Sequence, residues 1–110
     1  MIYLLHEAVT ERQLAGMLEA QQTFVKVAVD LRRGVLAGGG EFHADCESVL
    51  VEDGSVKEDV WGADWLPEEK VVRYGALINL RPRVNQHMEI QDPAIRRRVE
   101  EIVRKLLERP

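Results

Sequence analysis

The residues GVLAGGGEFHADCESVLVEDGS, from Gly34 to Ser55, contain five of the eight glycines and the only cysteine. They also hold the densest group of side chains able to do chemistry. The triple glycine at 38–40 interrupts a β pattern, since glycine permits a bulge or the close approach of another group. From residue 41 onward polar and apolar residues alternate, which predicts a strand. Asp53-Gly54 then predicts a hairpin turn into a returning strand at 56–61.

Strand patterns also lie on both sides of this stretch. Residues 23–31 are rich in β-branched side chains with alternating faces, and 32–34 form a turn signal before a partner strand at 35–37. Shorter strands are expected at 2–5, 70–74 and 76–81, the last two being separate or one strand bent at Gly75.

Two helices have clear start signals. Thr10 with Gln13 three residues later forms a capping box, and the helix is expected to end near residue 21 or 22. Asp92 followed by Pro93 marks the N-terminus of the last helix. The buried stripe of that helix repeats at helical spacing and comprises Ile95, Val99, Ile102, Val103 and Leu106. The order of elements predicts an α+β fold: a mostly antiparallel sheet of about five to seven strands with an N-terminal helix and a C-terminal helix on one face.

Composition limits the class of protein. With 110 residues, 45% of them hydrophobic and 31% charged, the chain is expected to be a single domain spanning 1–110. It has no apolar run of about 18 residues, as a membrane span requires, and no signal-peptide pattern. A single cysteine is typical of a reducing cytoplasm. The net charge of -4 argues against a nucleic-acid partner, because such binding needs a basic face.

The first candidate site is the polar face of the predicted strand at 41–47. Glu41, His43 and Asp45 would project on one side, with Glu47 beyond them, and this set suits a divalent metal such as Zn²⁺, Mn²⁺ or Fe²⁺. Alternatively, His43 is a general base oriented by Asp45. If the segment is helical instead, His43 and Glu47 remain neighbours. The competing interpretation is the solvated face of an edge strand.

The second candidate site is Asn79, Arg81 and Arg83, which would share one face of a strand. Two guanidinium groups and an amide can bind a phosphate or carboxylate. The alternative is that these arginines pair with the acidic strand. If the two candidate sites share one sheet, they would form a single cleft for an anionic substrate.

Three other features are interpreted as structural. Cys46 lies on the apolar face with Phe42 and Ala44, so we expect a buried, inert thiol. The triple glycine lacks the pattern of a phosphate-binding loop. Trp61 and Trp65 are expected to anchor the core or a loop rather than form a ligand platform.

Six short motifs lie along the chain: D-x-x-x-G at 30–34, G-G-E-x-H-A-D at 39–45, E-D-G-S at 52–55, W-G at 61–62, I-N-x-R-P at 78–82 and D-P at 92–93. Together they resemble a small bacterial and archaeal family of single-domain proteins of unknown function. The resemblance covers nearly the whole chain. It implies a shared fold and supplies no activity, substrate or cofactor.

Two functions follow as hypotheses. The first is a binding or interaction module, with self-association into a homodimer as one form of it. The second is a small hydrolase acting on a phosphate- or carboxylate-bearing substrate, either assisted by a divalent metal or using His43 as the base.

Overall fold

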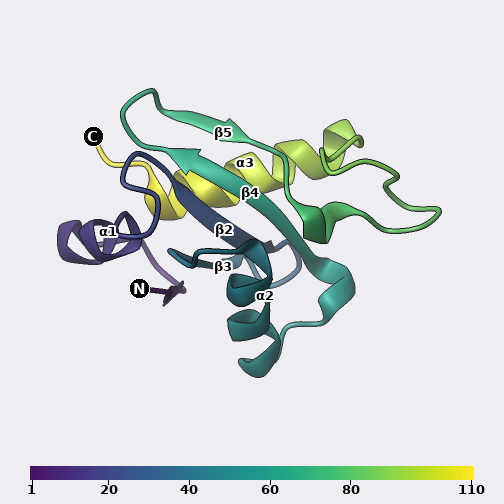
Figure 1. Ribbon diagram of the computed structural model, residues 1–110, viewed down its shortest axis with the longest axis horizontal. Coiled ribbons are helices and arrows are strands. Elements are labelled where there is room, and N and C mark those ends of the chain that lie inside the picture. Colours follow the sequence, from purple (N-terminus) through teal and green to yellow (C-terminus); the bar gives the residue numbers. More distant parts are fainter.

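One antiparallel sheet of five strands runs through the molecule, in the order β1-β3-β2-β4-β5 (Figure 1). The computed structural model describes residues 1–110. The strands are β1 (Tyr3–Leu5), β2 (Val25–Asp30), β3 (Val35–Gly38), β4 (Val60–Leu66) and β5 (Val71–Arg73). The helices are α1 (Glu11–Met17), α2 (His43–Glu52) and α3 (Pro93–Leu107), with 3₁₀ turns η1 (Lys57–Asp59) and η2 (Leu77–Asn79). The predicted α+β class is confirmed.

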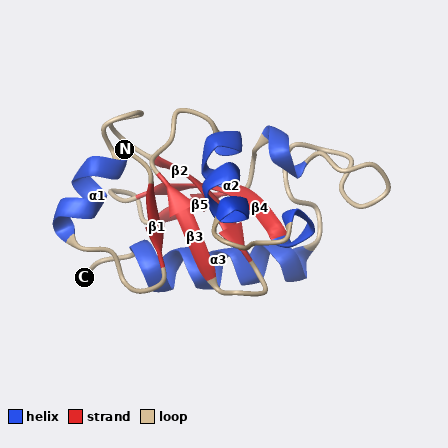
Figure 2. Ribbon diagram, turned by 90° about the horizontal axis from the view of Figure 1, so that it is seen from below, coloured by secondary structure: helices blue, strands red, loops and turns tan.

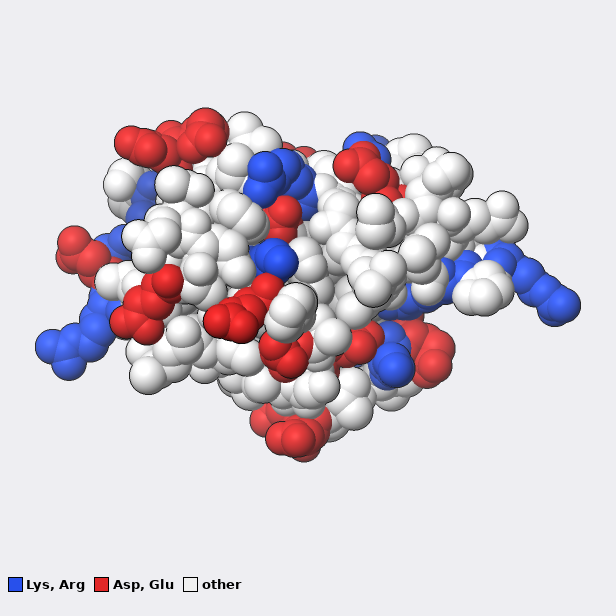
Figure 3. Space-filling view, viewed as in Figure 1, with Lys and Arg blue, Asp and Glu red and all other residues white.

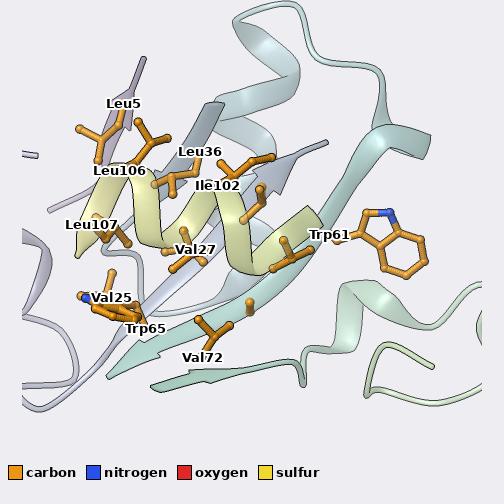
Figure 4. Close-up of a cluster of buried hydrophobic side chains, with 14 of the residues drawn as sticks. Leu5, Val25, Val27, Leu36, Trp61, Trp65, Val72, Ile102, Leu106 and Leu107 are labelled. Carbon is orange, nitrogen blue, oxygen red and sulfur yellow. The ribbon is translucent and has the colours of Figure 1, made fainter. Parts of the chain in front are cut away.

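Helix α3 covers one face of the sheet, as its apolar stripe predicts. Asp92 accepts a hydrogen bond from the Ala94 amide at 2.8 Å and Pro93 is the first helical residue. The buried face packs on the valines of β2 and on Trp65 of β4 (Figure 4). The helix contributes five buried side chains: Val99, Ile102, Val103, Leu106 and Leu107. Full burial of each such side chain stabilises the fold by roughly 1.5–3 kcal/mol.

Helix α2 lies on the opposite face, so the prediction of a strand at 41–52 is wrong. Figure 2 shows the sheet between α2 and α3. The two predicted helices, α1 and α3, contribute to the same core cluster, and α2 is an additional helix that packs on the other face. The alternation at 41–47 conceals a helical stripe in which Cys46 and Leu50, four residues apart, are both fully buried. Phe42, expected inside, is 63% exposed.

The Asp53-Gly54 signal ends this helix instead of making a hairpin. Gly54 has a φ of 110°, and its amide bonds to the Val51 carbonyl at 3.0 Å. The next amide, of Ser55, reaches back to the Leu50 carbonyl at 2.9 Å. This pair of bonds is a Schellman cap, which uses the same glycine conformation as a tight turn.

The N-terminal part of the chain supplies the edge strand β1 and helix α1. Helix α1 begins with the predicted capping box: the Gln13 amide bonds to Thr10 Oγ1 at 3.1 Å and the Thr10 amide bonds to Gln13 Oε1 at 2.9 Å. Gly39 has a φ of 106°, and an added Cβ would collide with the Met1 carbonyl oxygen. The triple glycine therefore serves packing. No helix is both long and apolar enough to cross a membrane.

Candidate functional site

A cavity of about 500 Å³ opens between the first turn of α2, strand β2 and the segment from Gly75 to Glu89. We call it the His43 cavity. Its walls are mostly apolar and come from Phe42, Ala44, Ala76, Leu77, Ile78 and Met88. Polar groups enter it from Lys26, His43 and Glu89. On the face seen in Figure 3, uncharged side chains gather right of centre, over η2, and Lys or Arg atoms lie at the right-hand end, over the far part of the loop after it.

A row of charged side chains crosses the sheet beside this cavity. The strand period of two places Lys26 of β2 and Asp64 of β4 directly opposite each other, and Asp64 lies opposite Arg73 of β5. Arg73 Nη2 is 3.3 Å from Asp64 Oδ2, and its guanidinium stacks on Phe24 at 4.7 Å. The first turn of helix α2 contacts this row.

The side chain of His43, the first residue of α2, contacts Asp64. Its Nε2 lies 2.9 Å from Asp64 Oδ1 and 3.0 Å from the Ala63 carbonyl oxygen. Both partners accept, so Nε2 carries the hydrogen and the lone pair of the neutral ring is on Nδ1. The two side chains are 12% and 13% exposed, so the contact is largely shielded from water. Nδ1 has no partner in the protein and remains accessible to solvent.

Lys26 is the second polar group of the cavity. Its Nζ donates to the Glu41 carbonyl oxygen at 3.0 Å and lies 5.7 Å from the centre of the Phe42 ring. No carboxylate is within ion-pair distance of it. The ammonium group has three N–H donors and uses one of them within the protein, so it can donate to a further acceptor.

The structure separates the members of the first predicted site. His43 faces the His43 cavity, whereas Glu41 and Asp45 line a different, open hollow beside the N-terminus. Residues two apart on a helix point in nearly opposite directions, so the change from strand to helix divides the set. No group of three His, Cys, Asp or Glu side chains is arranged to hold a metal ion. Asp64, not Asp45, is the carboxylate that contacts the imidazole.

Asn79 of the second predicted site is fully buried and binds only backbone. Its Oδ1 accepts from the Gly62 amide at 2.8 Å, and its Nδ2 lies 3.0 Å from the Gly62 carbonyl oxygen. The same Nδ2 lies 3.2 Å from the Tyr74 carbonyl oxygen and 3.1 Å from that of Met88. The predicted strand at 76–81 is instead η2 and its flanks, docked onto β4.

The two arginines of that set lie apart from each other. Arg81 stacks on Trp61, with its guanidinium carbon 4.0 Å from the ring centre, and donates to the carbonyls of Glu58 and Val60. Burial lowers its pKa, and the carboxylates of Glu47, Glu58 and Asp59 oppose that shift. An anion arriving at Arg81 would meet these acidic neighbours. Arg83 is an exposed loop residue with a φ of 70°.

Cys46 is the buried thiol that the sequence predicts. Burial is the main reason that its pKa rises to about 11. Its Sγ donates to the Lys26 carbonyl oxygen at 3.6 Å. A protonated, enclosed thiol is a poor nucleophile, so Cys46 belongs to the core under α2. Trp61 and Trp65 are likewise core residues, 4% and 1% exposed.

Sequence reasoning missed Asp64. The segment Trp61-Gly62-Ala63-Asp64-Trp65 alternates apolar residues with a glycine and an acid, which is the pattern of a strand with two different faces. The predicted strands leave out residues 62–66, so the one carboxylate that faces His43 is not among the predicted site residues.

The comparisons with known proteins give the chain a family and no activity. No curated protein and no solved structure significantly matches it. A family model described as "Protein of unknown function (DUF5674)" matches residues 3–106, which is nearly the whole chain and agrees with the resemblance seen in the motifs. The chain therefore belongs to the DUF5674 family of proteins of unknown function.

Proposed function

We propose that this protein is a binding module that takes a small, largely apolar molecule into the His43 cavity. The observation that carries the proposal is the combination of apolar walls with unsatisfied polar atoms, namely Nδ1 of His43 and the spare hydrogens of Lys26. Ligand sites in proteins commonly have this composition and volumes of roughly 300–1,000 Å³.

The construction of the outer wall supports the same proposal. The segment 74–91 exposes apolar side chains, yet it is fastened by buried amides. Asn85 Nδ2 lies 3.1, 2.7 and 3.0 Å from the carbonyl oxygens of Asn79, His87 and Glu89, and Asn85 Oδ1 accepts from the Gln91 amide at 2.8 Å. Leu77 and Met88 are nevertheless 69% and 55% exposed. Apolar groups held rigidly in water are typical of a surface that binds something.

A variant that blocks the cavity tests this function. Ala44 lines the cavity and is the second residue of α2, so Ala44→Phe places a ring at the mouth. Ala94→Phe is the matched control, because Ala94 is the exposed second residue of α3 and lies outside the cavity. A panel of small amphipathic molecules is screened by ligand-observed NMR. We expect binders of the wild type to bind Ala94→Phe and to lose affinity for Ala44→Phe. Equal binding to both variants contradicts the proposal.

General-base catalysis by His43 is a second candidate, favoured by the hydrogen bond from Nε2 to Asp64. Asp64 would orient the ring, and Nδ1 would take a proton from a bound water that attacks the substrate. No Ser, Thr or Cys side chain lines the cavity, so water is the available nucleophile. A panel of esters and phosphate esters tests this role. His43→Gln should abolish any hydrolysis found, and an unchanged rate in this variant rules the role out.

Self-association is the other form of binding to be tested. Both edge strands, β1 and β5, have three residues, so pairing of sheet edges between copies offers few hydrogen bonds. A homodimer would instead use the apolar side chains exposed on 77–88. Light scattering at rising concentration should then show a dimer that Leu77→Glu dissociates. Val56→Glu, at an apolar residue 47% exposed elsewhere, is the control.

A further inference from the structure

Lys26 differs from the other lysines of the chain. Lys57, Lys70 and Lys105 are exposed, whereas Lys26 is half-buried in the wall of the His43 cavity. A half-buried cation loses hydration and is usually compensated by an acidic partner. Lys26 has only the Glu41 carbonyl oxygen and the Phe42 ring.

The carboxylates around the cavity already have other hydrogen-bond or ion-pair partners. Asp64 Oδ1 receives His43 Nε2, and its Oδ2 faces Arg73. Glu89, the only acidic residue that lines the cavity, lies 3.3 Å from Arg96 Nη2 through its Oε1. On the sheet side of the cavity, the single carboxylate of Asp64 therefore lies between two cations, Lys26 and Arg73, which leaves one positive charge in excess.

We propose that the ligand of the His43 cavity is an amphipathic anion with a single carboxylate head. The head would lie against Lys26 Nζ, with the His43 ring beside it, and the apolar body would lie along Phe42, Leu77 and Met88. A carboxylate suits the site better than a phosphate monoester, because a phosphate monoester carries a charge of about −1.5 to −2 at pH 7 and Lys26 is the one Lys or Arg side chain in the cavity lining. This inference rests on the proposed binding function and adds the charge of the ligand.

Three probes with the same tail and different heads separate the two claims. Octanoate, octan-1-ol and octylammonium are titrated into the wild-type protein by calorimetry or NMR. We expect octanoate to bind about tenfold more tightly than octan-1-ol, in line with one charge-assisted hydrogen bond, and octylammonium to bind most weakly. If none of the three binds, the binding function itself fails. If all three bind equally, the cavity is a binding site and the anion proposal is overturned.

Variants of the lysine locate the effect. Lys26→Met keeps most of the apolar stem and removes the charge, so the affinity for octanoate should fall to that for octan-1-ol while the latter is unchanged. Lys26→Arg should restore the preference for the acid, and Lys105→Met, on the exposed side of α3, should leave it intact. A melting curve for each variant shows that it is folded. An undiminished preference for octanoate in Lys26→Met overturns the proposal.

Discussion

Replacing Asn79 by alanine should cost about 4–6 kcal/mol of the free energy of unfolding. The side chain makes one bond through Oδ1 and shares the two hydrogens of Nδ2 among three carbonyl oxygens. Three hydrogen bonds contribute about 1 kcal/mol each, and the Gly62 amide left without a partner in a buried position adds roughly 1–3 kcal/mol. Such a loss is a large fraction of the 5–15 kcal/mol by which a typical domain is stable.

Urea denaturation followed by the fluorescence of Trp61 and Trp65 measures this loss, because both rings are in the core. Gln86→Ala, at an exposed position of the same segment, is the control and should change stability little. Hydrogen exchange gives an independent reading: the Gly62 amide should exchange much faster in Asn79→Ala. A loss below about 1 kcal/mol would refute the reasoning, since it would mean that the amide bonds are no better than bonds to water.

Three other predictions concern single groups. Gly54→Ala should lower the free energy of unfolding by about 1 kcal/mol in a thermal melt, because alanine is strained at a φ of 110° although the space around it is open. Arg81→Met should also destabilise the fold, by about 2 kcal/mol, because it removes the stacking on Trp61 and two hydrogen bonds to carbonyl oxygens. An unaltered urea midpoint would show that water replaces both contacts. Because burial raises the pKa of Cys46 from 9.0 to about 11, the unfolded thiol ionises first as pH rises, so stability should fall between these values in the wild type and less in Cys46→Ala. A thiol reagent should label native Cys46 only as fast as the protein unfolds.

The parts of the fold that sequence reasoning predicted well depend on local signals. Thr10 and Gln13 satisfy each other's amides within one turn, and Asp92 with Pro93 prepares the first turn of α3. The valines of β2 alternate with residues of a different kind on the other face. In each case the interactions that decide the structure lie within a few residues of one another.

The error at 41–52 has a physical cause. A short segment with apolar residues at 42, 44, 46 and 50 satisfies both the strand period and part of the helix period, so only the packing partner decides between them. The partner is the small-residue face of β2 and β3, where Ala28 and Ala37 leave room for a helix on the sheet. The Asp53-Gly54 cap is equally ambiguous, because a hairpin turn and a helix end both use a glycine with positive φ.

The candidate site could be predicted only in part. His43 is one of several predicted site residues, but its partner Asp64 is 21 positions away and meets it only after α2 docks on the sheet. Asn79 and Arg81 were chosen for their chemistry as ligands. In the structure Asn79 is fully buried against main-chain atoms and the half-buried Arg81 stacks on Trp61, and both sets of contacts depend on the whole fold.

The amides of Asn79 and Asn85 contact main-chain atoms only. The hydrogen bonds that attach the cavity's outer wall therefore do not depend on which side chains this wall presents to solvent. Scaffold and contact surface are separately adjustable, as in binding proteins whose loops vary on a constant framework. If the proposed binding function holds, Leu77 and Met88, which line the cavity, can change with the ligand without remaking the fold.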